Sequence, residues 1–211
     1  MRIHRLEMQA FGPFADRQVI DFDELGAHGL FLLNGPTGAG KTSVLDAICF
    51  ALYGTVPGAR QQGRRLRSDH AAQDTAPEVV CEFSSGVRRF EVVRSPQWER
   101  PAKRAGGKST VTEQAKTLLR EFVDGAWVQK SSRNDEASAE ITELLGMNRD
   151  QFTRVVMLPQ GDFAAFLRAD AASREQLLQQ LFHIGYCVAA VVIADNEIIA
   201  VYFIKYLMNK C

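Results

Sequence analysis

Residues 34–43 contain the side chains and glycines of this sequence that are best suited to chemistry. The string Gly-Pro-Thr-Gly-Ala-Gly-Lys-Thr at 35–42 matches the pattern G-x-x-x-x-G-K-[ST] at every position. Glycines let the backbone turn tightly, so that successive N–H groups can surround an anion. Lys41 can then reach the β- and γ-phosphates of a nucleotide, and the Thr42 hydroxyl is placed to ligate Mg²⁺. The predicted binding residues are Asn34, Gly35, Pro36, Thr37, Gly38, Ala39, Gly40, Lys41, Thr42 and Ser43.

The predicted elements around this loop are the ones that a phosphate-binding loop needs. Residues 23–28 are predicted to form a loop. The apolar run at 29–33 is typical of a buried strand, and residues 43–53 have a helical pattern. Strand, glycine loop and helix place the loop N–H groups at a helix N-terminus, where the helix dipole favours negative charge. A glycine-rich turn that binds nothing is the alternative, and the complete motif in this context disfavours it.

Composition limits the classes to which the chain can belong. With 211 residues, 46% of them apolar, it can form one globular domain, or one and part of another. The formal net charge is zero, so any nucleic-acid site must be a local patch. The four cysteines form no C-x-x-C pair, which fits a reducing cytoplasm. Cys49 and Cys81 fall in a predicted helix and a predicted strand, where we expect buried, inert thiols.

Alternating apolar and polar residues predict several strands. The predicted strands are 3–11, 19–22, 78–83 and 87–94, the last two forming a hairpin around 84–86. Residues 111–123 suit either a helix or a twisted strand, but the pair Asp124-Gly125 after them favours a second hairpin. We therefore expect an antiparallel β portion formed by the segments around residues 1–22 and 78–95.

Helical patterns dominate the second half of the chain. Asn134 is a candidate N-cap for a helix that runs to Leu145, with Gly146 as its stop. The apolar segment 150–158 predicts a short helix, and residues 173–182 have amphipathic helical spacing.

Two groups of basic residues are candidates for contact with DNA phosphates. One group, inside a connection at 54–76 that we interpret as exposed, is Arg60, Arg64, Arg65 and Arg67. The other group, in a loop close to Trp98, is Arg100, Lys103, Arg104 and Lys108. Such clusters can neutralise phosphates, although a solvated surface is the more common reason for them. The histidines are scattered, and we assign them no role.

A second motif occupies residues 155–167, which read Val-Val-Met-Leu-Pro-Gln-Gly-Asp-Phe-Ala-Ala-Phe-Leu. This string resembles the glutamine loop of the SbcC-type repair ATPases. Other segments are similar to the same family, namely 6–14, 20–22, 35–48, 151–153, and Arg174 with the apolar residues that follow it. The resemblance covers about residues 1–186.

The resemblance implies an α/β fold of the P-loop NTPase class: the N-terminal lobe of an ABC-type, SMC-like ATPase head with a mixed sheet. It implies ATP and Mg²⁺ as ligands, with residues 35–43 around the triphosphate and Thr42, or Ser43, orienting the metal. Gln160 then corresponds to the glutamine that reaches toward Mg²⁺ and the attacking water. A neutral amide suits this catalytic role, because its oxygen can coordinate a hard cation while its nitrogen donates to water or to the γ-phosphate.

Partners are implied by the same resemblance. In this family a long coiled coil separates the N-terminal segment from a C-terminal ATPase segment, and two heads sandwich two ATP molecules. ATP binding and hydrolysis control an SbcD-like nuclease subunit that processes double-stranded DNA ends in break repair and recombination. A transporter-type ATPase, a small-molecule kinase and a truncated, non-enzymatic remnant are the alternatives. The glutamine-loop segment disfavours the kinase, and a transporter ATPase usually carries its signature motif in the same short chain.

The end of the chain departs from the family pattern. Where the coiled coil should begin, residues 187–211 are rich in Val, Ile and Tyr and have no heptad charge pattern. We therefore predict a domain at 1–182 and an atypical tail at 183–211, which is frameshifted, fused or otherwise substituted. An ordinary terminal strand or helix is the alternative. An exposed, β-prone tail of this kind should aggregate or pack on the sheet.

Membrane insertion is not expected. Asp195-Asn196-Glu197 divides the tail into two apolar runs of about eight residues, whereas a spanning helix needs about 20. The N-terminus also lacks the apolar core of a signal peptide. We expect a cytoplasmic protein.

Two catalytic elements of the family are not recognisable in the sequence. No segment resembles the signature motif, and no apolar strand ends in the Asp-Glu of a Walker B motif. Phosphoryl transfer depends on a positioned Mg²⁺, an oriented water and charge stabilisation. We therefore expect the chain to bind ATP but to hydrolyse little of it alone.

Overall fold

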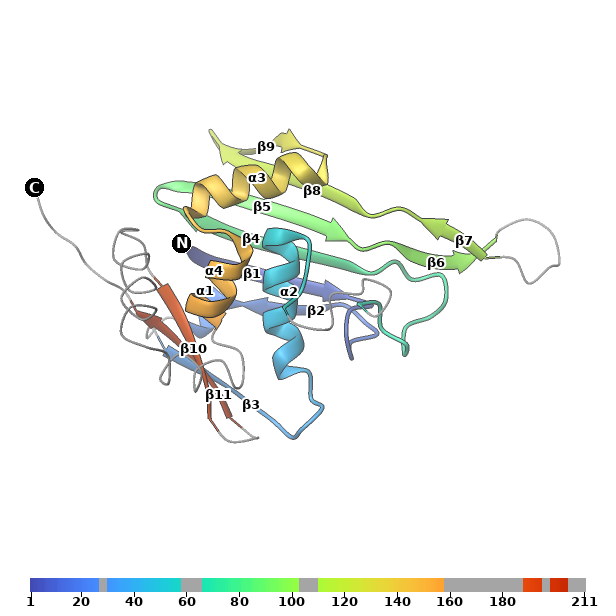
Figure 1. Cartoon of the computed structure of the whole chain (residues 1–211), viewed down its shortest axis with the longest axis horizontal. Coiled ribbons are helices and arrows are strands. Elements are labelled where there is room, and N and C mark those ends of the chain that lie inside the picture. Colours follow the sequence, from blue (N-terminus) through green and yellow to red (C-terminus); the bar gives the residue numbers. More distant parts are fainter. Residues whose placement is uncertain (27–29, 58–65, 103–109, 158–187, 195–197, 205–211) are drawn as a thin grey trace, which may run out of the picture.

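A six-stranded antiparallel sheet forms the largest layer of the structure (Figure 1). The computed structural model describes residues 1–26, 30–57, 66–102, 110–157, 188–194 and 198–204. The strand order is β2-β1-β4-β5-β8-β9. The strands are β1 (Arg2–Gln9), β2 (Gln18–Asp21), β4 (Glu78–Ser85), β5 (Arg88–Ser95), β8 (Lys116–Val123) and β9 (Ala126–Ser131). The antiparallel portion predicted around residues 1–22 and 78–95 is therefore confirmed.

Alternating side chains give this sheet one apolar face. In β4, Val79, Cys81 and Phe83 are buried, and the residues between them are partly exposed. Successive strand residues point to opposite faces, so these three share one side of the sheet. Phe83 stacks on Phe90 of β5, with 5.5 Å between the ring centroids. Such a face must be covered by another layer to be removed from water.

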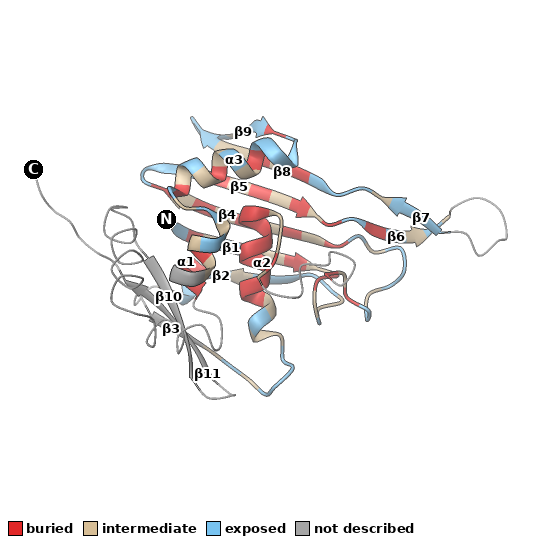
Figure 2. Ribbon diagram, viewed as in Figure 1, coloured by how far each residue is buried: buried red, intermediate tan, exposed pale blue. Residues whose placement is uncertain are grey.

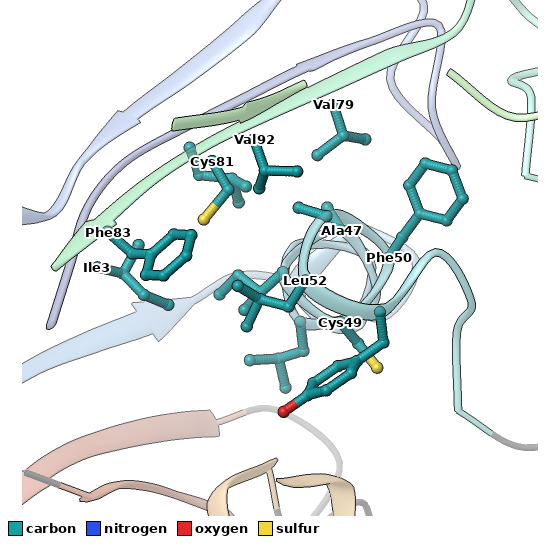
Figure 3. Packing of buried hydrophobic residues seen from close by; sticks show 14 of the residues in the cluster. Ile3, Ala47, Cys49, Phe50, Leu52, Val79, Cys81, Phe83 and Val92 are labelled. Carbon is teal, nitrogen blue, oxygen red and sulfur yellow. The ribbon is translucent and has the colours of Figure 1, made fainter. Parts of the chain in front are cut away.

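Helix α2 (Lys41–Tyr53) covers this face, and α3 (Asn134–Leu145) lies beside it (Figure 1). Residues 44–53 of α2 are all buried (Figure 2). Figure 3 shows Ala47 and Leu52 pointing from α2 toward the apolar side chains of the sheet. A helix that is buried on all sides is typical of a protein core. The helix after the glycine loop is thus held in the middle of the domain.

The strand before the glycine loop belongs to a second sheet. β3 (Leu30–Asn34) pairs with β11 (Ile198–Ile204), which pairs in turn with β10 (Val188–Ala194). The register places Ile198 opposite Asn34, the last residue of β3. All strand pairings within the described ranges are antiparallel. Two stretches of the predicted tail are therefore strands beside the strand that leads into the loop.

A two-stranded ribbon extends the large sheet at one end (Figure 1). β6 (Trp98–Pro101) follows β5, and β7 (Thr110–Glu113) precedes β8. Across the ribbon, Arg100 Nε donates to Glu113 Oε1 at 2.7 Å. One of the basic segments noted in the sequence is thus partly built into a β-ribbon.

The turn between β8 and β9 confirms the second predicted hairpin. Asp124 and Gly125 have φ values of +50° and +84°. A two-residue turn of type I′ needs left-handed backbone at both central positions, which Asp-Gly provides. The helical alternative for residues 111–123 is therefore wrong.

A short helix replaces part of the loop expected at 23–28. α1 spans Phe22–Leu25, because the Asp21 carboxylate accepts hydrogen bonds from the N–H groups of Asp23 and Glu24 at 2.9 and 3.0 Å. Asp is a preferred N-cap, so the signal was present in the sequence.

The connection at 54–76 also differs from the prediction, because its described residues are not all exposed. Val56 and Ser68 are buried, and the Ser68 N–H donates to the Ala10 carbonyl at 2.8 Å. This backbone bond ties the connection to the end of β1. The polar composition of this segment did not indicate the hydrogen bond, since the main chain makes it.

The helices near residue 150 agree with the predicted short helix. α4 spans Arg149–Phe152 and continues into a π-helix at Thr153–Met157. Asn148 Oδ1 accepts from the Gln151 N–H, and Gln151 Oε1 accepts from the Asn148 N–H, which forms a capping box at the start of α4. The predicted helix at 173–182 lies outside the described residues.

Candidate nucleotide-binding site

The predicted phosphate loop connects the end of β3 to the start of α2 in one tight turn. Gly38 and Gly40 have φ values of +88° and +89°, in the left-handed region that glycine adopts most readily. The Ala39 N–H donates to the Pro36 carbonyl at 3.1 Å and closes the turn. Of the residues predicted at 34–43, Asn34 is the last residue of β3, 35–40 form the connection and 41–43 lie in the first turn of α2.

The connection between β1 and β2 packs against the loop. A Cβ on Gly40 would lie 2.4 Å from Phe14 Cζ and 3.0 Å from Pro13 Cγ. A Cβ on Gly12 would lie 3.0 Å from Ser43 Oγ. Position 40 therefore requires glycine for its space as well as for its backbone angle. No sequence motif indicates that this N-terminal segment contacts the loop.

The Lys41 side chain lies across the loop. Its ammonium group donates to the Gly35 carbonyl at 2.5 Å and to the Pro36 carbonyl at 3.1 Å. These hydrogen bonds hold the positive charge of Lys41 against the loop. Thr42, the next residue, is exposed, so its hydroxyl is accessible at the first turn of α2.

The N-terminus of α2 suits an anion. Its N-cap is Gly40, no described side chain caps the first turn, and that turn contains no acidic residue. The first N–H groups of a helix have no intrahelical acceptor, and the helix dipole adds positive potential there. Together with the ammonium group of Lys41, these N–H groups fit a phosphate.

The buried thiol in α2 is not part of this chemistry. Cys49 and Cys81 are both buried, as predicted, and burial raises the pKa of each thiol to about 12. A thiol is a nucleophile only when it is ionised, so both are inert near neutral pH. Figure 3 shows Cys49 on the side of α2 that faces away from the large sheet.

Several predicted residues cannot be placed. Gln160 lies outside the described residues, as do six of the basic residues proposed for DNA contact: Arg60, Arg64, Arg65, Lys103, Arg104 and Lys108. The other two make contacts within the chain. The Arg67 guanidinium lies 5.4 Å from the ring centroid of Trp98, and Arg100 pairs with Glu113.

Arg94 is a buried charged residue that belongs to none of the sequence motifs. It is 1% exposed and lies beneath the C-terminal end of α2, where it contacts α3 as well. Helix α3 covers the predicted range to Leu145, but its N-cap is Arg133, and the Asn134 side chain accepts from Arg94 Nη1 instead. The signal was the strand alternation, because Arg94 shares the face of Phe90 and Val92.

A cavity of about 130 Å³ borders Arg94, at the opposite end of α2 from the phosphate loop. It is lined by Phe50, Gly54 and Pro96, among others, and therefore does not coincide with the loop. Within the described ranges, no cluster of three or more His, Cys, Asp or Glu side chains could hold a metal ion. Of the helices described, none has the length and hydropathy to span a bilayer.

A comparison with family models agrees with this geometry. The model described as "AAA domain" matches residues 5–184. A strand, a glycine loop and a buried helix beside an antiparallel sheet are the N-terminal lobe of a P-loop ATPase, and the chain belongs to the AAA domain family. The predicted fold class is thus confirmed.

Curated relatives specify the branch of this family. The chain is 44% identical to the SbcC subunit of the nuclease SbcCD from Vibrio cholerae, over 86% of its own length and 18% of the relative's. It is 37% identical to the protein of that name from Treponema pallidum and 35% identical to the one from Lactococcus lactis, each over 17% of the relative. The chain thus spans less than a fifth of the length of these relatives. The predicted resemblance to SbcC-type proteins is confirmed.

Proposed function

We propose that this chain binds ATP and Mg²⁺ through residues 34–43 and forms part of the ATPase head of an SbcC-like subunit. The observation that carries the proposal is the shape of the loop. Gly38 and Gly40 turn its backbone, and Lys41 lies across it at the free N-terminus of α2. This arrangement is what a triphosphate requires, and the relatives are named as a nuclease subunit.

Each loop residue has a proposed role. The N–H groups of Gly35 and of residues 37–43, with the Lys41 ammonium, would bind the triphosphate, and Asn34 precedes them at the end of β3. The Thr42 hydroxyl, or that of Ser43, would ligate Mg²⁺, which neutralises phosphate charge when it is bound. Gln160 is proposed as the residue that orients the attacking water.

The partners and the process are proposed from the relatives. An SbcD-like nuclease subunit, a second ATPase head and double-stranded DNA ends would interact with the complete subunit, in a cytoplasmic repair reaction. The C-terminal ATPase segment would supply the signature motif and the Walker B carboxylates. We propose that residues 1–182 are the domain that takes part and that 183–211 is an atypical tail, whose strand β11 pairs with β3.

A nucleotide titration of the 211-residue chain tests the binding site. A fluorescent ATP analogue should bind in the presence of Mg²⁺, and Lys41→Ala should weaken binding at least about tenfold, because charge-assisted hydrogen bonds are lost. Lys116→Ala is the matched control, since it removes an exposed lysine from β8. Equal affinity of the wild type and Lys41→Ala would contradict the proposal.

The same preparation tests the expected lack of turnover. Steady-state phosphate release should stay near the background of the Lys41→Ala variant, although nucleotide is bound. The reason is that binding and positioning of the phosphates are only part of phosphoryl-transfer catalysis. Turnover at the rate of an ordinary enzyme, lost in Lys41→Ala, would show that this expectation is wrong.

A further inference from the structure

The guanidinium of Arg94 connects the end of α2 to the large sheet. Arg94 lies in β5, and its Nε donates to the Ala51 carbonyl at 2.7 Å. Its Nη2 donates to the Leu52 carbonyl at 3.3 Å. Both carbonyls belong to the last turn of α2, where backbone oxygens have no intrahelical donor. The arginine therefore caps the C-terminus of the helix whose N-terminus carries the phosphate loop.

The same guanidinium reaches β8 and α3. Nη1 donates to Thr117 Oγ1 at 3.4 Å and to Asn134 Oδ1, and Nη2 donates to Ser138 Oγ at 3.0 Å. One side chain thus joins two strands and two helices. The planar fork of arginine makes this possible, because it presents several donors in fixed directions.

The charge of Arg94 is stabilised by helix carbonyls. All five of the acceptors above are neutral oxygens, and burial lowers the pKa of Arg94 to about 10. A cation is favoured at a helix C-terminus, where the helix dipole is negative. Helix α2 therefore has a buried cation at one end and a site suited to an anion at the other.

The chain leaves space for this contact. Gly54, which follows α2, has a φ of +73°. A Cβ at this position would lie 2.9 Å from Arg94 Nη1 and 3.0 Å from Asn134 Oδ1. Glycine thus allows the guanidinium and the amide to approach the end of the helix.

We propose that Arg94 is a positioning residue for the nucleotide site, because it clamps the C-terminal end of α2 to β5, β8 and α3. This inference rests on the proposed function. A helix is rigid, so a shift at its C-terminus moves the N–H groups about 20 Å away at its N-terminus. Phosphate binding depends on the directions of those N–H groups. Without the clamp, the loop adopts its binding geometry for a smaller fraction of the time.

Stability and positioning predict different results. If Arg94 only stabilised the core, its loss would lower the free energy of unfolding but leave the affinity of the folded chain unchanged. If Arg94 positions α2, affinity falls even where the chain is fully folded. A nucleotide titration well below the unfolding midpoint separates the two effects.

Two variants and one control test the clamp in the 211-residue chain. Arg94→Lys keeps the positive charge but loses the planar guanidinium, and Ser138→Ala removes one of the two hydrogen bonds from Arg94 to α3. Val92→Ala truncates a buried side chain of the same strand without removing a hydrogen bond of the clamp. Circular dichroism and urea unfolding establish that each variant is folded, and a fluorescent ATP analogue with Mg²⁺ measures affinity.

Arg94→Lys should weaken nucleotide binding about tenfold, as expected if the competent fraction falls to about a tenth. Ser138→Ala should weaken it about twofold to threefold, and Val92→Ala should bind within about twofold of wild type although its unfolding midpoint falls. Wild-type affinity in folded Arg94→Lys, or an equal loss in Val92→Ala, overturns the inference. If Arg94→Lys does not fold, wild-type affinity in Ser138→Ala overturns it.

The proposed function fails in a distinguishable way. If the wild-type chain and Lys41→Ala bind nucleotide equally poorly, then the site itself is wrong and the clamp has nothing to position. If the wild type binds, Lys41→Ala does not, and Arg94→Lys binds like wild type, then only the role of Arg94 is wrong.

Discussion

At the scale of single residues, two glycines of the phosphate loop have the same backbone conformation in different surroundings. Among the described residues, no atom lies within 4 Å of the position of a Cβ on Gly38, whereas a Cβ on Gly40 would meet Phe14. Gly38→Ala should therefore lower the free energy of unfolding by about 1–2 kcal/mol, the cost of a left-handed backbone alone. Gly40→Ala should cost more, because the phenyl ring must also move. Urea unfolding measures both values.

A second substitution checks the cause of that difference. Gly40→Ala should cost less stability in a chain that already carries Phe14→Ala than in the wild type, since the ring that clashes with the new methyl group is absent. The explanation is wrong if Gly40→Ala costs no more than Gly38→Ala.

The two buried thiols predict a loss of stability at alkaline pH. Cys49 and Cys81 have pKa values raised to about 12 by burial, whereas an unfolded thiol ionises near pH 8.5. Between these values the unfolded state binds fewer protons than the folded state, so stability falls as pH rises from about 8.5 toward 12. The slope is at most about 1.4 kcal/mol per pH unit for each thiol.

Urea unfolding between pH 8 and pH 10 tests this linkage. The wild type should lose stability across this range more steeply than the double variant Cys49→Ala, Cys81→Ala, which lacks both groups. Parallel pH profiles would contradict the argument. Tyr53, whose pKa is raised mainly by burial, is present in both proteins, so its contribution to the two pH profiles is similar.

At the scale of elements, a β-bulge at His4 connects β1 to β4 and to α1. The pairing of β1 with β4 shifts register between Ile3 and Arg5, so His4 is an extra residue whose side chain is redirected. His4 Nδ1 lies 2.8 Å from Asp23 Oδ2 in α1, and Nε2 lies 3.1 Å from Ser84 Oγ in β4. The imidazole therefore connects β1, β4 and the short helix.

His4→Ala should lower the free energy of unfolding by about 1–2 kcal/mol, because two hydrogen bonds are lost and their partners remain. Arg5→Ala is the matched control on the same strand. Its exposed ion pair with Glu7 should contribute less than about 1 kcal/mol. A smaller effect for His4→Ala than for Arg5→Ala, measured by urea unfolding, would show that the histidine does not join these elements.

At the scale of the whole molecule, the strand before the phosphate loop depends on a distant part of the chain. β3 pairs with β11, so removing residues 183–211 should leave an unpaired strand edge and lower solubility. A chain that ends at Ile204 keeps β11 and is the control. Light scattering and urea unfolding should show more aggregation and lower stability for the chain that ends at Phe182. Equal behaviour of the two chains would contradict the pairing.

Much of the site could be predicted because its signals are local. The loop at 35–42 needs glycine at fixed positions, and Asp124-Gly125 suits one turn type, so neither depends on remote contacts. The contacts of Phe14 with the loop could not be predicted, because they join segments whose separation in the chain has no regular pattern. For Arg94, the alternation of β5 predicts that the side chain is buried, but the local sequence does not predict which groups accept its hydrogen bonds.

The sequence by itself determined the phosphate loop, the strands with one apolar face and the membership in an ATPase family. The loop and the strands follow from residue type and spacing, since backbone freedom and side-chain periodicity are properties of short segments, and the family follows from the resemblance of its motifs. Only the tertiary structure decided that β3 pairs with β11 and that Arg94 caps the helix behind the loop. The physical reason is that a buried polar group takes its partners from whatever elements the packing brings together, and packing involves the whole chain.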